Sequence, residues 1–293
     1  IFVKIKKLIS ALVLGSMLVG LSGCNITDFS AENLLRPPKA VGDEAEIEQL
    51  IAKTADSGYT LKYPKNGKFR SAIIMTDLDG NDSNEAVAFF RNSAETSSVH
   101  MLVMYSKDNS WEIASDNIFE TTDIDSVDFA DLTGNGKAEI IVNSTTYTPN
   151  VGKLSCYSYS EGKTNEVGSG QSCSSFVTGD FDNDGTSEIM SLVLYTTENE
   201  ALASMLDYNE DSKSLYAKAM ANMDPNVVKY KNIAVTKLDN DITGIVVDGT
   251  SANEVTNTQV IFYSRDLAIL RNPLFKEKAK NITRRSSQVI CSD

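Results

Sequence analysis

The sequence predicts an all-β protein made of repeated units. An acidic loop occurs three times, and the copies align position for position; they are residues 77–85, 131–139 and 180–188. An apolar strand follows each loop. A second strand then ends in a Tyr that lies the same number of residues after the loop start in all three copies. A unit of about fifty residues that contains four short strands is typical of a β-propeller blade.

The amino terminus has the features of a secretory signal. Three lysines precede an apolar run over residues 8–19, and the tetrapeptide that ends at Cys24 is Leu-Ser-Gly-Cys. This tetrapeptide resembles the bacterial lipobox, in which the cysteine is diacylated. We therefore expect residues 1–23 to be a lipoprotein signal peptide and Cys24 to carry the lipids that anchor the protein. The alternative is an ordinary signal peptide followed by an incidental cysteine.

The segment after the signal peptide is expected to be a tether and then a helix. Residues 24–42, with their Arg-Pro-Pro-Lys sequence, are typical of a flexible tether. Residues 43–57 are expected to form a short, acidic, amphipathic helix. No second stretch is long and apolar enough to span a membrane. We therefore expect a protein that is lipid-anchored at the cell membrane and faces the extracytoplasmic side.

Residues 58–293 are expected to form the propeller. Residues 59–63 look like a lone outer strand that precedes the first blade. Residues 289–293 match the strand and first aspartate that open the earlier loops. Closed propellers have about 4–8 blades, so we expect the chain to be part of a longer protein with further blades after residue 293. The predicted blades are about residues 69–120, 121–168, 169–222 and 228–272, with the start of a fifth at 284–293.

Each acidic loop offers side-chain oxygens at positions 1, 3 and 5 and a glutamate at position 9, which suits a hard cation such as Ca²⁺. A glycine at position 6, replaced by Asp82 in the first loop, permits the positive φ of a sharp turn. The flanking segments have the pattern of strands, so these loops are not EF-hands. The third loop has the most carboxylates and the second the fewest. For any single loop, the alternative is a solvated hairpin turn.

The fourth copy, residues 237–245, is degenerate. It has Lys237 at position 1 and no acid at position 9. We expect it to bind no metal, with the Lys237 ammonium neutralising Asp239 and Asp241 instead. Metal sites are therefore expected in three of the four copies.

These loops resemble the calcium-binding repeats of the FG-GAP/VCBS family, the blades of integrin α-subunit-like propellers. The resemblance covers roughly residues 58–293 and is to the looser bacterial form, because the Phe-Gly and Gly-Ala-Pro segments of the integrin version are absent. It implies a bacterial lipoprotein with Ca²⁺ as its cofactor. It also implies a backbone carbonyl ligand from position 7 of each loop, which is Ser83, Lys137 or Thr186. The implied side-chain ligands are Asp77, Asp79, Asn81, Glu85, Asp131, Thr133, Asn135, Glu139, Asp180, Asp182, Asp184 and Glu188.

Composition limits the possible partners. The formal net charge is −13, so nucleic acids and anionic surfaces are poor partners. Cys156, Cys173 and Cys291 lack the spacing of a metal site. We expect the first two to be free, buried thiols, because we place them on strands that are not adjacent in a blade. The single histidine, His100, lies in an apolar strand and is expected to be structural.

No catalytic residue is predicted. The sequence has no nucleophile elbow, metalloprotease helix or phosphate-cradling loop, and the repeat explains every acidic cluster. The leading hypothesis is a surface-anchored, non-catalytic binding module for an extracellular protein or glycan, with calcium stiffening the blades. The alternative is a polysaccharide-degrading propeller lyase or hydrolase. That alternative requires acids, histidine or arginine to converge in the central channel.

Overall fold

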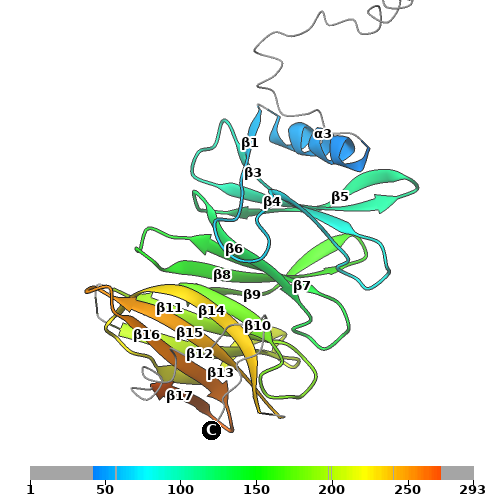
Figure 1. Cartoon of the computed structure of the whole chain (residues 1–293). Coiled ribbons are helices and arrows are strands. Elements are labelled where there is room, and N and C mark those ends of the chain that lie inside the picture. The colour runs from blue at the N-terminus through cyan, green and yellow to red at the C-terminus, as the bar shows by residue number, and fades with distance from the viewer. Residues whose placement is uncertain (1–41, 57, 197, 199, 240, 272–293) are drawn as a thin grey trace, which may run out of the picture. The chain divides into compact units, whose positions relative to one another are not determined.

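The computed structural model describes residues 42–271, apart from residues 57, 197, 199 and 240. The predicted signal peptide, Cys24, Cys291 and the start of a fifth blade lie outside the described residues. Within the described part the fold is all-β, with one α-helix and four antiparallel sheets (Figure 1). None of its helical residues belong to a segment with the length and apolar character needed to cross a bilayer.

The first sheet has the strand order β1–β3–β4–β5, and β2 also pairs with β3. Its strands are β1 (Tyr59–Leu61), β2 (Ile73–Thr76), β3 (Glu85–Asn92), β4 (Val99–Lys107) and β5 (Ser110–Phe119). Strands β1 and β2 lie one after the other along the same edge of β3. The expectation of a lone outer strand at residues 59–63 is therefore wrong. Residues 59–61 belong to the first sheet, where the Tyr59 ring packs edge-on against Phe90.

The other three sheets share one plan, in which four strands follow one another in chain order. The second sheet contains β6 (Ile124–Ala130), β7 (Glu139–Thr145), β8 (Gly152–Ser160) and β9 (Lys163–Cys173). The third contains β10 (Ser175–Gly179), β11 (Glu188–Tyr195), β12 (Glu200–Asn209) and β13 (Ser214–Asn222). The fourth contains β14 (Val227–Asp239), β15 (Ile242–Ser251), β16 (Thr256–Tyr263) and β17 (Leu267–Arg271). Each sheet is therefore blade-like, with its first strand at one edge and its last at the other.

Helix α3 (Asp43–Ala55) covers one face of the first sheet (Figure 1). Its first turn is acidic and its last turn contains a lysine, which complements the helix dipole. Ile47 and Ile51 are four residues apart, so they share one face, and both are buried against β3 and β4. The Glu46 carboxylate accepts a hydrogen bond from the backbone N–H of Trp111 at 3.0 Å, which joins the helix to β5. The expected acidic amphipathic helix is present over residues 43–55.

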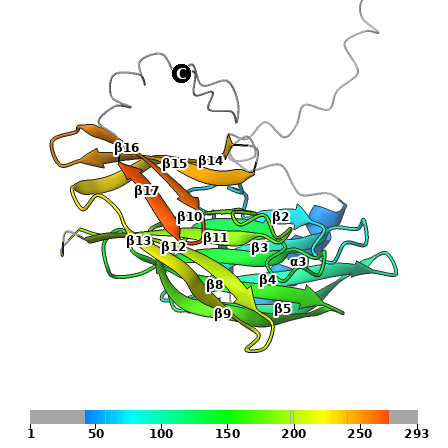
Figure 2. The ribbon, with the colours of Figure 1, turned by 90° about the horizontal axis from the view of Figure 1, so that it is seen from below.

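Apolar side chains fill the spaces between consecutive sheets. The second strand of each of the first three sheets is buried on both faces, since the first six residues of β3, β7 and β11 are all buried. Separate clusters join the first sheet to the second, the second to the third and the third to the fourth. In the last of these, β14 contacts β10 and β11, and Figure 2 shows the ribbons of the third and fourth sheets. The unbroken apolar runs of these strands therefore reflect burial on both faces.

The two described cysteines are free and buried in the cluster between the second and third sheets. The expectation of free thiols is correct, but its reason is wrong, because Cys156 and Cys173 lie on β8 and β9, which pair directly. In that pairing Cys156 lies opposite Gly168, and Cys173 lies opposite Gly152. Burial raises the pKa of the Cys173 thiol to about 12 and also raises that of Cys156. Both thiols are therefore protonated at neutral pH.

The single histidine is buried among partners in the first sheet. The His100 ring is 7% exposed and stacks on Phe90 with 4.8 Å between the ring centroids. Its Nδ1 lies 2.9 Å from the Asp116 carboxylate on the neighbouring strand. These contacts fix the ring within the first sheet.

The strand connections divide between two ends of the sheets. The acidic loops connect β2 to β3, β6 to β7 and β10 to β11, and we call this the loop end. Neighbouring strands are antiparallel, so the β7–β8 connection and the first residues of β6 and β10 lie at the opposite end. The connector between β1 and β2 also lies there, since Lys65 and Asn66 donate backbone hydrogen bonds to Ile124 and Asp125.

The packing of α3 predicts that the helix contributes to the stability of the first sheet. Ile51→Ala leaves a cavity at a fully buried position, which typically lowers the free energy of unfolding by about 2–5 kcal/mol. Lys53→Ala, on the exposed side of the same turn, is the matched control and should change little. Urea unfolding followed by tryptophan fluorescence measures both, because Trp111 lies in the same cluster. Equal midpoints for the two variants would show that the helix is not part of the folded core.

Candidate metal centres

The three acidic loops share one backbone turn. Positions 4 and 6 of each loop have positive φ, with values between 61° and 94°. The expectation for position 6 is confirmed, and Asp82 adopts φ 65° there in place of glycine. Position 4 also needs a positive φ, and the residues there are Gly in the first two loops and Asn in the third. The residues at positions 4 and 6 are Gly80, Asp82, Gly134, Gly136, Asn183 and Gly185.

In the first loop, the aspartate at position 1 organises the turn. Its carboxylate accepts the N–H groups of Gly80 at 2.8 Å, Asn81 at 3.3 Å and Asp82 at 2.9 Å. Desolvation opposes ionisation of Asp77, but these donors outweigh it and hold the pKa of Asp77 below its usual range. The second loop has the same three hydrogen bonds, at 2.7–3.2 Å, to Asp131. Both turns therefore place a negative charge at the centre of the loop.

The residues at positions 5 and 7 form a second small turn. The Asn81 side-chain oxygen accepts the Ser83 N–H at 2.7 Å, and Asn135 does the same for Lys137 at 2.8 Å. In the third loop, Asp184 accepts the Thr186 N–H at 2.8 Å. The side-chain oxygen at position 5 is thereby held toward the loop interior in all three copies.

The glutamate at position 9 is the first residue of a buried strand. Glu85, Glu139 and Glu188 are 3%, 1% and 0% exposed. In each loop, one carboxylate oxygen accepts the backbone N–H of position 2 at 2.8 Å. Burial raises the pKa of all three carboxyl groups. A cation beside these glutamates would compensate the buried charge.

The residue at position 2 anchors each loop in the core. Leu78, Leu132 and Phe181 are at most 2% exposed and belong to the three clusters between sheets. The hydrogen bond from position 2 to position 9 therefore joins the acidic loop to the packing between sheets.

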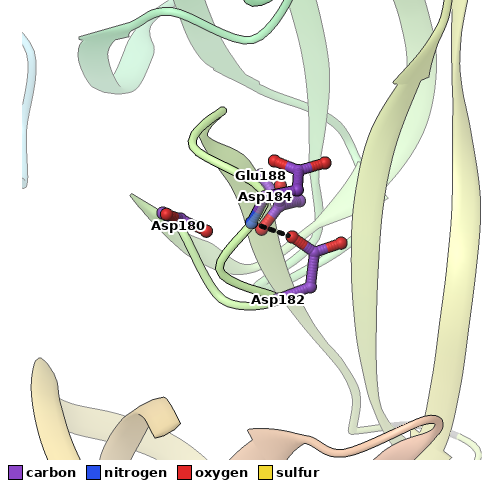
Figure 3. Close-up of side chains that lie close together, drawn as sticks. All are labelled: Asp180, Asp182, Asp184 and Glu188. Carbon is purple, nitrogen blue, oxygen red and sulfur yellow. Dashed lines mark hydrogen bonds between the residues drawn. The ribbon is translucent and has the colours of Figure 1, made fainter. Parts of the chain in front are cut away.

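The first and third loops each bring carboxylates together. The oxygens of Asp77, Asp79 and Glu85 lie within 4.8 Å of one another, so this group could hold a metal ion. In the third loop the same holds for the four residues shown in Figure 3, which are Asp180, Asp182, Asp184 and Glu188. The drawn hydrogen bond runs from the Asp184 N–H to Asp182 at 3.1 Å.

Buried oxygens without partners support a cation at these two loops. In the third loop, Asp180 Oδ1 and Glu188 Oε1 are buried and have no hydrogen-bond partner among the described residues. In the first loop, the same is true of Asp79 Oδ1. A buried acceptor without a partner is costly, and a bound cation would satisfy it. The donor set of carboxylate oxygens fits a hard ion such as Ca²⁺ or Mg²⁺.

A lysine from another strand reaches the third loop, which sequence analysis did not anticipate. The Lys218 ammonium, on β13, donates to the Asp182 carboxylate and to Asp207 at 2.7 Å. Desolvation lowers the pKa of Lys218, but these two carboxylates outweigh it and raise the pKa. Lys218 therefore neutralises part of the third loop and competes with a cation for Asp182.

The second and fourth copies differ from the other two. In the second loop, Thr133 donates to the Glu139 carboxylate at 3.2 Å, so this oxygen already has a partner. In the fourth copy, Lys237 donates to the Thr243 hydroxyl at 2.7 Å. Among the described side chains Lys237 forms no ion pair with Asp241. The expected neutralisation of Asp241 is therefore wrong, and the Asp239 side chain lies outside the described atoms.

Neighbouring loops are hydrogen-bonded to each other. The Ala138 N–H in the second loop donates to the Leu78 carbonyl in the first at 3.1 Å. The Ser187 N–H in the third loop donates to the Asp131 carbonyl in the second at 2.9 Å. The Asn183 side chain then donates to the Asp241 carbonyl in the fourth copy at 2.6 Å. The four copies thus form one connected row at the loop end.

No protein-family model matches this chain, and no curated protein matches it significantly. The likeness of the loops to FG-GAP/VCBS repeats therefore stays a prediction.

The buried glutamate of the third loop predicts a pH dependence of stability. Burial raises the pKa of Glu188 to about 8 from an ordinary 4.5; the Phe181 hydrogen bond opposes this shift, and the charges of Asp182, Asp184 and Asp207 add to it. The folded state holds this proton more tightly than the unfolded state. Without metal, the stabilisation is therefore complete below about pH 4.5 and is lost as the pH rises through about 8.

Glu188→Gln stays neutral and keeps an oxygen for the Phe181 N–H. In chelator, its free energy of unfolding should fall less than that of wild type between pH 5 and 8, and at pH 8 it should be the more stable protein. Glu120→Gln, at an exposed position, is the control. Urea unfolding at several pH values makes the measurement, and identical slopes for wild type and Glu188→Gln would contradict the prediction.

Proposed function

We propose that this protein is a calcium-stabilised β-propeller that serves as a non-catalytic binding module, anchored to the membrane through Cys24. The observation that carries the proposal is the row of acidic loops at one end of four blade-like sheets, with buried carboxylate oxygens that lack partners. Cations bound in this row of loops would link each sheet to the next. A rigid scaffold then leaves the opposite end for a ligand.

The propeller part of the proposal is supported by the strand order. In the second, third and fourth sheets, the first strand is at one edge and the last at the other. Strands β6, β10 and β14 contact one another in sequence, β10 with β6 and β14 with β10. First strands gathered side by side are the arrangement expected around a propeller axis.

Calcium is favoured over a purely solvated turn by the buried glutamates. A solvated turn does not need a fully buried carboxylate, whereas position 9 supplies one in each acidic loop. Seven-fold or similar oxygen coordination from carboxylates, an amide and a carbonyl suits Ca²⁺ better than the smaller Mg²⁺, which retains several waters.

Binding is favoured over catalysis by a cavity of about 610 Å³ between the first strands. Among the described residues that line it, Asp125 is the one carboxylate, and there is no histidine or arginine. Asp125 is already hydrogen-bonded to Asn66 at 2.8 Å and Ser126 at 3.0 Å. A glycoside hydrolase of the usual kind requires two converging carboxylates, whereas Asp125 is the one carboxylate among the described lining residues.

Calcium should raise the free energy of unfolding. Saturation at about 100 times the dissociation constant adds about 2.7 kcal/mol for each site. Asp180→Ala should remove more of this increment than Asp131→Ala, because the third loop has four clustered carboxylates. Asp131 also accepts three backbone hydrogen bonds. The quantity to compare is therefore the difference between calcium and chelator for each variant, measured by thermal unfolding. A wild-type melting temperature that is the same in calcium and in excess chelator would rule out structural calcium.

The binding role is tested by screening the full-length protein against glycan and protein arrays in calcium. A wild-type protein that retains no ligand on either array would contradict the binding role. Release of an acidic or unsaturated sugar fragment from a bound polysaccharide would instead support the enzyme alternative.

The lipid anchor predicts that Cys24 is acylated. Cys24→Ala removes the only thiol in the Leu-Ser-Gly-Cys sequence, so the variant should not incorporate a fatty acid. Metabolic labelling with an alkyne-tagged fatty acid in a bacterial host measures this. Equal labelling of wild type and variant would show that the anchor is elsewhere or absent.

A further inference from the structure

A cavity of about 610 Å³ lies at the end of the sheets opposite the acidic loops. Ligand pockets in proteins commonly have volumes of about 300–1,000 Å³. Its walls come from the β1–β2 connector, from β6, from β7 and its connection to β8, and from strands β10, β11 and β14. We infer that this cavity binds a segment of an acidic polysaccharide, with Lys229 and Lys231 contacting its carboxylates and Tyr147 stacking on a sugar ring. The inference rests on the binding function proposed above and names its ligand class.

The lining is rich in groups that hydrogen-bond to sugar hydroxyls. Amide and hydroxyl side chains predominate, among them Asn143, Thr145, Asn150 and Ser175. Asn143 is 1% exposed, and its Oδ1 has no hydrogen-bond partner among the described residues. Its Nδ2 group, in contrast, donates to Asp125 at 3.4 Å. Asn143 thus lies in the wall of the cavity with a buried oxygen that has no partner among the described residues.

The free edges of the first strands supply more hydrogen-bonding groups. Strands β10 and β14 are each the terminal strand of their sheet, so one edge of each has no strand neighbour in the described part. Residues 175–177 and 229–233 of these strands line the cavity. Backbone N–H and C=O groups at a free strand edge need partners, and hydroxyl groups can act as donors and acceptors.

The charge of the cavity is opposite to that of the protein. Lys65, Lys229 and Lys231 line it with a single carboxylate, that of Asp125, although the chain has a formal net charge of −13. Lys65 is already paired with Asp123 at 3.1 Å. Lys229 and Lys231 are exposed and form no ion pair with any described residue.

Lys231 lies at an irregularity in the pairing of β14 with β15, two residues after Lys229. The register shifts between Tyr230 and Asn232, so Lys231 has no partner on β15. A bulge of this kind redirects a side chain and is common beside binding sites. The pair of unneutralised ammonium groups therefore selects an anionic ligand, and carboxylates on successive sugar residues match two separate charges.

One segment that lines the cavity also carries an exposed aromatic residue. Tyr147 lies in the β7–β8 connection, between the lining residues Thr146 and Thr148, and is 97% exposed. An aromatic face next to a polar cavity suits the apolar face of a sugar ring.

The test is isothermal titration of the full-length protein, in calcium, with tetrasaccharides of galacturonate and of mannuronate and with neutral maltotetraose. Wild type should bind at least one acidic tetrasaccharide and bind maltotetraose at least tenfold more weakly. The double variant Lys229→Ala/Lys231→Ala should lose tenfold or more in affinity, since a charge-assisted hydrogen bond contributes about a factor of ten or more. Tyr147→Ala should weaken binding severalfold.

The matched control is Lys107→Ala/Lys163→Ala, which removes the same charge from two exposed lysines elsewhere. It should retain wild-type affinity. If the control loses as much affinity as the Lys229/Lys231 variant, the loss comes from the change in net charge alone, and the proposed site is overturned. Equal binding of neutral and acidic tetrasaccharides would overturn the ligand class.

The outcomes also separate this inference from the proposed binding function. A protein ligand found on the arrays, whose binding survives Lys229→Ala/Lys231→Ala, would overturn the inference and leave the binding function standing. If wild type binds no acidic tetrasaccharide but the arrays yield another ligand, the inference is also overturned and the binding function stands. If wild type binds no ligand at all, both proposals fall.

Discussion

The hydrogen bond from position 2 to the glutamate at position 9 is the contact on which the repeat depends. It closes each acidic loop at 2.8 Å in all three copies. The residue that donates it inserts its side chain into the core between two sheets, and the residue that accepts it begins a strand buried on both faces. The backbone N–H of position 2 thus connects an exposed, polar loop to the hydrophobic core. A buried carboxylate is costly unless it is paired, so the same contact that orders the loop also creates its need for a cation.

The connections between loops extend this constraint along the chain. Each acidic loop is bonded to the next through a backbone N–H or a side-chain amide, and each is anchored in a different cluster. A cation in the third loop would therefore order the fourth copy as well, through the Asn183 amide, although that copy lacks the acids to bind a cation itself. Nearest-neighbour coupling of this kind is general in repeat proteins, whose stability is a sum of unit and boundary contributions.

The features that the sequence predicts well are those encoded within about ten residues. The acidic loops, the positive φ at Asp82 and the strand that begins at Glu188 each follow from local residue types at fixed spacing. Features that depend on distant contacts were missed or misplaced. Lys218 reaches Asp182 from 36 residues away, and no local pattern marks it.

Strand β1 and the cavity are two further features that depend on contacts between residues far apart in the sequence. Strand β1 was expected at an outer edge, whereas pairing with residues 90–92 places it beside β3. The cavity collects residues from several separate segments of the chain, so its lining cannot be read from any one of them. The lysines on β14 are visible in the sequence, but their place in the lining of the cavity depends on how strands of separate sheets come together.

The two thiols between the second and third sheets give the protein a built-in chemical reporter. Cys156 and Cys173 are fully buried in a boundary formed by two different repeats. A thiol reagent in solution can reach them only when that boundary separates, so the rate of alkylation follows the equilibrium between closed and transiently open states. The native chain thus carries, without any engineered label, a kinetic readout of how strongly two neighbouring repeats adhere.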